Sequence, residues 1–258
     1  MKIIDFHTHV FHPKVAHLAI DKLENHYGYK WQCTGTIEDL EQNLDSVYRA
    51  VVFATPTKPE QTQINNNYLM GIKNEKLIVF GSLHPDYEDV EGEIKRVKEH
   101  GLSGFKFHPD FQGFDVDSEK ALEMYEKIGP DYPIMLHIGD KKFNHSAPKR
   151  LEKVLDIFPK HKFIAAHLGG YSTWDDEGKC LIGKKLWIDT SSALMFLTPE
   201  RATEIIKNHG VDKVLFGSDY PSVTVEKELE FFNKLKLTKR EKEKILYKNA
   251  EKLLKLNG

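Results

Sequence analysis

His7 and His9 are the first residues of the chain that could do chemistry, and they end an apolar, strand-like run in the sequence IIDFHTHVF. Side chains alternate along a β-strand, so two residues separated by one other point to the same side. Two neutral imidazoles on one side can bind a single divalent cation. Capped or exposed histidines form the same pattern, so this pair indicates a metal only if further ligands lie elsewhere in the chain.

Three later residues could complete such a site. His137 follows an apolar run in IMLHIGD, His167 does so in FIAAHLGG, and Asp219 in VLFGSDYP. Alone, His137 could be a packed histidine and Asp219 a helix cap. Together they offer a third nitrogen and a carboxylate oxygen. A set of nitrogen and oxygen ligands without thiolate suits one zinc ion, with manganese or iron as alternatives.

One coordination position would remain open for water in such a centre. A divalent ion lowers the pKa of bound water toward ~7 and so makes hydroxide available at neutral pH. Asp219 could take the proton from this water. His167 is either a further ligand or a general acid/base, since its unperturbed pKa lies near neutrality. We therefore predict Asp219 and His167 as the catalytic residues.

Other polar residues also follow apolar runs. Lys106 either contacts a substrate carboxylate or pairs with an acid inside the fold, and His108 either lines the pocket or belongs to a turn with the proline after it. We predict Lys106 and His108 as substrate-binding residues. His84 stands in a similar His-Pro-Asp triplet and is interpreted as a turn. Asp189 is expected to position a loop and not to act in catalysis.

The elements that must position these residues alternate regularly. Helical patterns with apolar residues three and four apart separate eight short runs, most of them apolar on both faces as in buried parallel strands. The expected strands are residues 3–7, 50–54, 77–83, 103–108, 133–138, 162–167, 186–190 and 213–218. The expected helices are residues 14–27, 36–47, 63–75, 88–101, 118–129, 147–158, 199–210, 225–235 and 240–256.

Eight strand–helix repeats favour a single α/β domain over residues 1–258, a (β/α)8 TIM barrel. An open doubly wound sheet is the competing fold, but no glycine-rich dinucleotide fingerprint follows the first strand. In such a barrel, chemistry occurs at the carboxyl ends of the strands, where these histidines and Asp219 fall. The segment 10–35 is long for a connection and is expected to form a lid or pocket wall.

Composition excludes several classes of protein. The 258 residues carry a net charge of −2, which gives no basic footprint for nucleic acid or an anionic membrane. No apolar run approaches the ~20 residues of a membrane span, and the first residues do not predict a secretory signal. Cys33 and Cys180 are far apart, so no disulfide scaffold is expected and a reducing cytoplasmic location is the default. The expected partner is a small-molecule substrate.

The ordered set of motifs resembles the amidohydrolase superfamily, and within it the amidohydrolase-2 branch. This branch holds the aminocarboxymuconate-semialdehyde decarboxylase-like enzymes and dicarboxylate lactonases. The resemblance rests on His7-Thr8-His9, the lone His137, and the segments HLGG and GSDYP, and it extends to GFKFHP, DTSSA and NAEKLL. The motifs span nearly the whole chain in the expected order.

The resemblance implies a metal-dependent enzyme on a distorted barrel. His7, His9, His137 and Asp219 match the family's metal ligands, and His167 matches a histidine that binds metal in some members and acts on water or substrate in others. Binuclear members carry a carbamylated lysine on the fourth strand, which would be Lys106 here; the single-metal branch does not use it, and one metal is favoured. Homodimers are common in the family.

We predict a metal-dependent hydrolase that acts on a small, carboxylated ester, lactone or amide through metal-activated water. The alternative is a metal-dependent, non-oxidative decarboxylase of a small carboxylic acid at the same site. The motifs do not separate these two reactions, because both use the same ligands. A metal-binding barrel with a sensing role is a third hypothesis.

Overall fold

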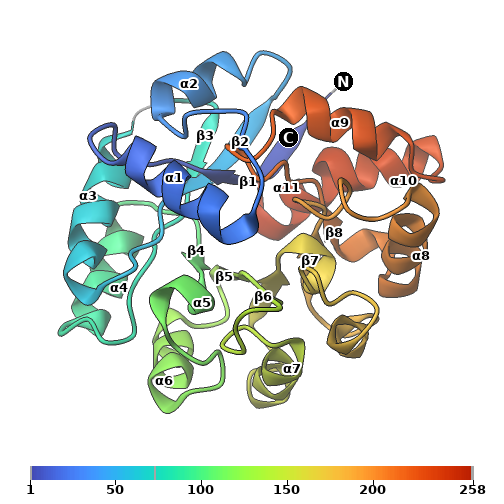
Figure 1. The fold of residues 1–258 in the computed structure, drawn as a ribbon. Coiled ribbons are helices and arrows are strands. Elements are labelled where there is room, and N and C mark those ends of the chain that lie inside the picture. The colour runs from blue at the N-terminus through green and yellow to red at the C-terminus, as the bar shows by residue number, and fades with distance from the viewer. Residues whose placement is uncertain (1, 73, 257–258) are drawn as a thin grey trace.

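The computed structural model describes residues 2–72 and 74–256 and shows a parallel β-barrel surrounded by helices (Figure 1). Consecutive strands pair in parallel within two groups, the first three and the last five. The (β/α)8 prediction is confirmed. The strands are β1 Ile4–His9, β2 Arg49–Phe53, β3 Leu77–Val79, β4 Phe105–Phe107, β5 Pro133–Leu136, β6 Lys162–Ala165, β7 Trp187–Asp189 and β8 Val214–Leu215.

Two seams close the barrel. Gly81, after β3, bridges to Phe105 of β4. At the other seam the Phe6 N–H donates to the carbonyl of Phe216 at 2.8 Å, and Thr8 of β1 bridges to Tyr220. Because the first and last strands meet, the open doubly wound alternative is excluded, and β1 and β8 present their ends side by side.

The helices cover the outside of the barrel. Thr36, Thr198, Thr224 and Thr238 cap four of them by accepting a backbone N–H with the hydroxyl oxygen. The helices are α1 Ala16–Tyr27, α2 Ile37–Gln42, α3 Thr62–Gly71, α4 Val90–Glu99, α5 Pro109–Gln112, α6 Glu119–Ile128, α7 Pro148–Ile157, α8 Pro199–His209, α9 Val225–Asn233, α10 Lys239–Glu243 and α11 Asn249–Leu254. Short 3-10 turns occupy Pro59–Gln61, His167–Gly169, Glu177–Leu181 and Val211–Lys213.

Several expected boundaries are wrong. The helix expected over 36–47 ends at Gln42, and the one over 240–256 is divided by a π-helical turn, Lys244–Lys248, between α10 and α11. The strand expected over 213–218 contains only Val214 and Leu215. It stops there because the Phe216 N–H donates to Ile245 and the Gly217 N–H to the Thr190 hydroxyl, which takes both groups out of the strand ladder.

Alternation along the strands divides the core into two. Phe105 and Phe107 of β4 pack outward with the helices, so Lys106 between them faces the barrel interior. A separate buried cluster fills one end of the interior; it consists of Ile4, Phe6, Val51, Phe53, Ile78, Phe80, Met135, Ile164, Trp187, Leu215, Ala250 and Leu253. The last two belong to α11, which therefore covers this end. The opposite end is left for polar side chains.

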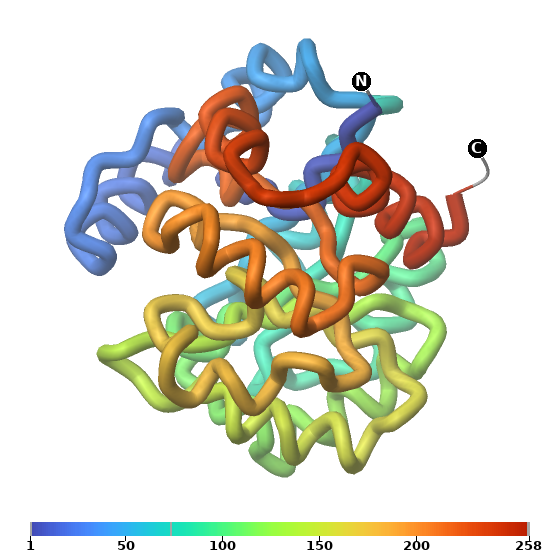
Figure 2. Tube along the Cα trace, turned by 90° about the vertical axis from the view of Figure 1, so that its right-hand side faces the viewer, coloured from blue at the N-terminus to red at the C-terminus, as the bar shows by residue number. Residues whose placement is uncertain are grey.

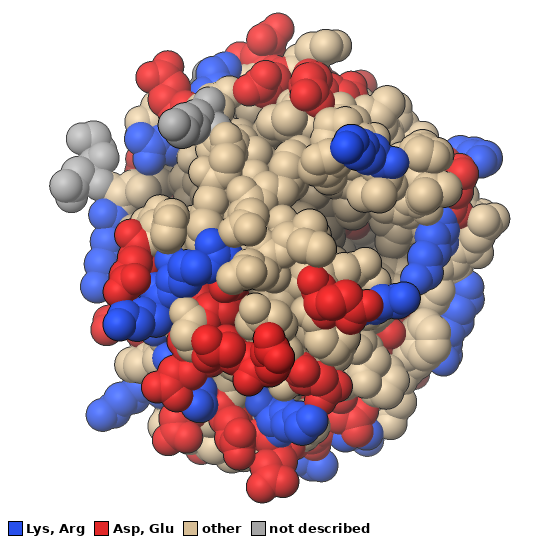
Figure 3. All heavy atoms as spheres, turned by 90° about the vertical axis from the view of Figure 1, so that its left-hand side faces the viewer, with Lys and Arg blue, Asp and Glu red and all other residues tan. Residues whose placement is uncertain are grey.

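The lid expected over residues 10–35 is present. Figure 1 shows α1 in front of the strands, and Figure 2 shows α1 at one end of the barrel and α11 at the other. α1 thus covers the end at which the strands terminate. None of the described helices is long and apolar enough to cross a membrane. On the face near α3 and α4, acidic and basic side chains lie side by side (Figure 3), without a basic expanse suited to nucleic acid.

Candidate metal centre and active site

His7, His9 and Asp219 converge where β1 and β8 end side by side. The Nε2 atoms of His7 and His9 are 3.2 Å apart, and Asp219 Oδ1 lies 3.2 Å from the first and 3.5 Å from the second. The Asp219 backbone N–H donates to the His7 carbonyl at 2.9 Å, which fixes the loop after β8 against β1. Three of the predicted ligands therefore share one small volume.

Local backbone structure makes this approach possible. The pairing of β1 with β2 shifts register between Asp5 and Thr8, so β1 contains an extra residue beside His7. Such bulges re-aim side chains and often lie next to active sites. Gly217 packs directly against His7: a Cβ at this position would lie 2.7 Å from the His7 Cβ. A larger residue there would displace the imidazole.

His137 and His167 form a second pair beside the first. His137 Nδ1 and His167 Nε2 are 2.9 Å apart, and the rings of His167 and His7 have centroids 5.1 Å apart. His167 has a φ of +59°, a conformation that few residues other than glycine adopt, in the 3-10 turn after β6. His137 thus adjoins the group through His167, and its own ligand atom clusters with those of His108 and Asp110.

In His7, His137 and His167, the ring nitrogen that faces away from the cluster makes a hydrogen bond to an acceptor. This bond indicates which nitrogen carries the proton. His7 Nδ1–H donates to Asp189 Oδ2 at 2.9 Å, His137 Nε2–H to the Gly139 carbonyl at 3.0 Å, and His167 Nδ1–H to the Ser191 carbonyl at 2.9 Å. The remaining nitrogens therefore carry lone pairs. These lone pairs face one another across the two pairs of histidines.

The protonation states of these side chains make the space between them attractive to a cation. Burial lowers the pKa of His7, His9 and His137, so these imidazoles are neutral at pH 7. Burial would raise the pKa of Asp219, but His7 and the hydrogen bond from His9 hold it well below its usual range. Neutral imidazoles and an ionised carboxylate gathered at one point suit a divalent cation. The donor set therefore fits a divalent cation, without distinguishing zinc from manganese or iron.

Lys106 faces this cluster from β4. Its Nζ lies 3.2 Å from His7 Nε2 and 5.0 Å from the centre of the Phe53 ring. Within the described residues no carboxylate lies within 4.0 Å of this ammonium, so the expectation of an internal ion pair is wrong. Burial lowers the pKa of Lys106 to about 8. The side chain is placed to meet a negatively charged ligand.

His108 lines the cavity, as one of its two sequence interpretations predicts. Its ring stacks on His137 with centroids 4.0 Å apart, and Nε2 lies 3.2 Å from the Tyr27 hydroxyl of α1. His108 Nδ1 is buried and has no hydrogen-bond partner among the described residues. His84 instead holds a turn, because Nε2 bonds the Gln112 carbonyl at 2.9 Å and Nδ1 accepts the Asp86 N–H.

A cavity of about 110 Å³, open to solvent at its mouth, ends at the cluster. Strand-end residues form its floor and α1 with the following segment forms one wall. Aromatic rings make up much of this lining. The lining residues are His9, Phe11, Ala19, Lys22, Leu23, Tyr27, Trp31, Thr55, Thr57, His108, Phe111, His137, His167 and Asp219.

The Amidohydrolase family model matches residues 4–256 of the sequence. The chain belongs to the amidohydrolase family. The family predicted from the order of the motifs is therefore confirmed, and the protein is a metal-dependent enzyme of this family.

Three proteins similar to this amidohydrolase are decarboxylases. Decarboxylase orsB of Emericella nidulans is 28% identical over 161 residues, which cover 61% of this chain and 44% of that protein, so the match spans less than half of orsB. 2,6-Dihydroxybenzoate decarboxylase from Rhizobium superimposes with a TM-score of 0.77 at 16% identity, over 100% of both chains. Dihydroxybenzoic acid decarboxylase from Polaromonas sp. JS666, with bound manganese and the inhibitor 2-nitroresorcinol, gives a TM-score of 0.76 at 16% identity, over 100% of this chain and 98% of that one.

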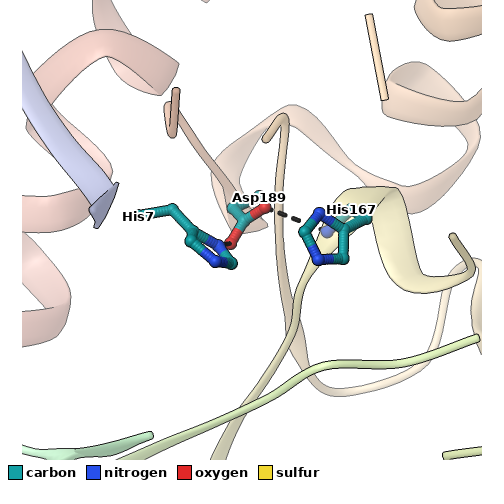
Figure 4. Close-up of side chains that lie close together, drawn as sticks. All are labelled: His7, His167 and Asp189. Carbon is teal, nitrogen blue, oxygen red and sulfur yellow. Dashed lines mark hydrogen bonds and ion pairs between the residues drawn. The ribbon is translucent and has the colours of Figure 1, made fainter. Parts of the chain in front are cut away.

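Asp189 of this amidohydrolase has a larger role than the sequence indicates. It is fully buried; Oδ2 accepts from His7, and Oδ1 accepts the N–H of His167 at 3.0 Å and of Ser191 at 3.1 Å. Figure 4 shows Asp189 between the two histidines. Asp189 therefore orients the ring of His7 and the backbone of His167. The signal in the sequence is an acid at the end of a buried strand followed by a hydroxyl-rich turn.

Proposed function

We propose that this amidohydrolase removes carbon dioxide, without oxidation, from a small aromatic carboxylic acid, with one divalent ion held by His7, His9, His137 and Asp219. The observation that carries the proposal is a cavity walled by aromatic rings that ends at this nitrogen and carboxylate cluster. The decarboxylase relatives support this alternative over the hydrolysis that the sequence analysis placed first. Manganese, bound in the Polaromonas enzyme, is the metal we favour over zinc.

When bound, the metal would supply positive charge that holds the carboxylate of the substrate. Lys106 adds a second positive charge beside His7. His108 offers its unpartnered Nδ1 to an oxygen of the substrate. The ring would lie among Phe11, Tyr27 and Phe111, which form flat apolar walls in the lining.

Decarboxylation requires one proton at the carbon that loses the carboxylate. The bond between ring carbon and carboxylate carbon breaks, its electron pair is taken by the proton, and carbon dioxide leaves. We assign this proton transfer to Asp219, with His167 beside it. Since Asp219 is ionised in the free protein, it first has to gain a proton from water or from an acidic hydroxyl of the substrate.

The proposal is tested by incubating the manganese-loaded protein with 2,6-dihydroxybenzoate and 2-hydroxybenzoate and measuring carbon dioxide and phenols. We expect one equivalent of carbon dioxide per equivalent of resorcinol or phenol formed. In deuterium oxide the product should carry one deuterium at the former carboxyl position. Hydrolysis of esters or lactones by the same preparation, with no carbon dioxide from any aromatic acid, would overturn the proposal in favour of the hydrolase prediction.

A further inference from the structure

Two polar atoms in the cavity wall have no use in the proposed chemistry. Trp31 Nε1 and Thr55 Oγ1 are both buried, belong to residues that line the cavity, and have no hydrogen-bond partner among the described residues. A buried donor without a hydrogen-bond partner destabilises the protein. A ligand that supplies the missing partner removes this destabilisation on binding.

The structure holds Trp31 firmly in place. Its backbone N–H donates to Glu24 Oε1 of α1 at 2.9 Å, and its ring stacks on Tyr27 with centroids 6.4 Å apart. The next residue, Gln32, donates its N–H to the Ser222 carbonyl at 3.2 Å, in the loop that follows Asp219. Trp31 is therefore fixed between the lid and the metal-binding loop, and its indole N–H is a donor only.

Thr55 lies beyond the end of β2 on the cavity floor. It follows Phe53, whose ring contacts His9 with centroids 4.8 Å apart. The neighbouring Thr57 also lines the cavity, but its hydroxyl donates to Gln61 Oε1 at 3.2 Å. Of these two threonines, only Thr55 has a hydroxyl without a hydrogen-bond partner in the described part of the chain.

We propose that Trp31 and Thr55 form a second polar subsite, in which each can bind an oxygen substituent of the aromatic substrate other than the carboxylate held at the metal centre. The indole N–H donates to such an oxygen, and the Thr55 hydroxyl either donates to one or accepts from one. Exposed Lys22 of α1 lies in the same lining and favours an ionised substituent. The inference rests on the proposed function, from which it takes the aromatic acid as ligand.

Binding of matched ligands tests this subsite. Calorimetry with the manganese-loaded protein would compare 2-hydroxybenzoates that carry either a hydroxyl or a methyl group, of nearly equal size, at ring position 4 or 5. We expect the hydroxyl compound to bind about three- to tenfold more tightly at one position or both. Trp31→Phe and Thr55→Val should each reduce this ratio, and the double variant should bring it to one.

Trp187→Phe is the matched control, because Trp187 lies in the apolar cluster at the opposite end of the barrel. Its hydroxyl-to-methyl ratio should equal that of the wild type. If Trp31→Phe does not fold, the nearly isosteric Thr55→Val carries the test. Equal binding of hydroxyl and methyl compounds at both positions, a preference that survives in the double variant, or no binding of any compound would overturn the inference.

The two proposals fail separately. A hydroxyl preference that depends on Trp31 and Thr55, without release of carbon dioxide, supports the subsite and contradicts decarboxylation. Release of carbon dioxide without any hydroxyl preference supports decarboxylation and contradicts the subsite.

Discussion

At the scale of single residues, the candidate centre depends on acceptors that lie behind its histidines. Asp189 accepts from His7, and backbone carbonyls of Gly139 and Ser191 accept from His137 and His167. Each bond fixes the orientation of a ring and leaves the other nitrogen free to bind a cation. The arrangement is therefore set before any metal arrives.

Asp189→Asn tests this preorganisation. We expect manganese affinity to fall by about 10- to 100-fold, because the amide offers one acceptor oxygen where the carboxylate serves both His7 and two backbone N–H groups. Calorimetric titration of the metal-free protein with manganese measures the effect. Asp45→Asn, at an exposed aspartate, is the control. Equal affinity in the two variants would contradict the role given to Asp189.

Glu228 of α9 gives a prediction about stability and pH. Its side chain is fully buried, and neither carboxylate oxygen has a hydrogen-bond partner among the described residues. Burial, with smaller contributions from Asp5 and Asp219, raises its pKa well above the ordinary value. The folded protein therefore holds a proton that the unfolded chain releases above about pH 4.3, and stability contributed by this group is lost as pH rises from there toward the raised pKa.

Glu228→Gln removes this ionisation. We expect the free energy of unfolding of the variant, minus that of the wild type, to increase from pH 5 to pH 8, by at most about 1.4 kcal/mol per pH unit. Urea unfolding of the metal-free proteins at several pH values measures this difference. A difference that stays constant over this range would show that Glu228 does not retain its proton in the folded state.

The sequence identified residues whose side chains commonly bind metals and which stand in recognisable motifs. It did not identify residues whose role depends on contacts that only the fold creates. His7, His9 and Asp219 stand in recognisable motifs at strand ends, and the structure brings them together. Asp189 is expected from the sequence to position a loop, and its bonds to backbone N–H groups agree with this, but its bond to the His7 ring, 182 positions away, could not be predicted. Trp31 and Thr55 carry no motif, and what distinguishes Thr57 from Thr55 is the hydrogen bond from the Thr57 hydroxyl to Gln61.

At the scale of elements, apolar runs predicted the eight strands and the length of the segment 10–35 predicted the lid, but neither predicted where the strands stop. β8 is only two residues long because side-chain and distant backbone acceptors take the next two N–H groups. The register shift in β1 is likewise invisible in a run of residues that all suit a strand. Local patterns give the type of an element, whereas tertiary hydrogen bonds decide its ends.

The lid α1 is fastened at its carboxyl end. His26 Nε2 lies 3.0 Å from Asp140 Oδ2, and the Lys142 ammonium donates to the His26 carbonyl. Asp140→Asn weakens this connection between the lid and the loop after β5. We expect amide hydrogen exchange within residues 16–27 to become about two- to tenfold faster, as the loss of roughly one hydrogen bond implies.

Mass spectrometry of exchanged peptides measures this change, and KM for an accepted substrate should rise more than kcat falls. Asp115→Asn is the control, since Asp115 pairs with His145 and Arg150 and not with the lid. Faster exchange spread evenly over the whole chain would indicate general destabilisation and contradict the specific fastening of α1.

At the scale of the whole molecule, closure of the barrel brings the two ends of the sequence to one site. β1 lies beside β8 only because the ring of strands is complete, and this places His7 and His9 against Asp219. An ion bound there would link β1, β5 and β8. Metal binding should therefore stabilise the fold as a whole.

We expect the midpoint of thermal unfolding to rise with manganese concentration, with a stabilisation of about 2.7 kcal/mol at a free concentration 100 times Kd. Differential scanning calorimetry with and without a chelator measures this effect. His9→Ala should lose most of the manganese-dependent increase. An increase of equal size in His9→Ala would indicate that the ion binds elsewhere.

The most direct test of the account is a crystal structure of the manganese-soaked protein with diffraction recorded at the manganese absorption edge. The account predicts one anomalous peak at the convergence of His7 Nε2, His9 Nε2, His137 and Asp219, with Lys106 outside its ligand sphere. A second peak bridged through Lys106, or no peak within coordination distance of His7, His9 and Asp219, would contradict it.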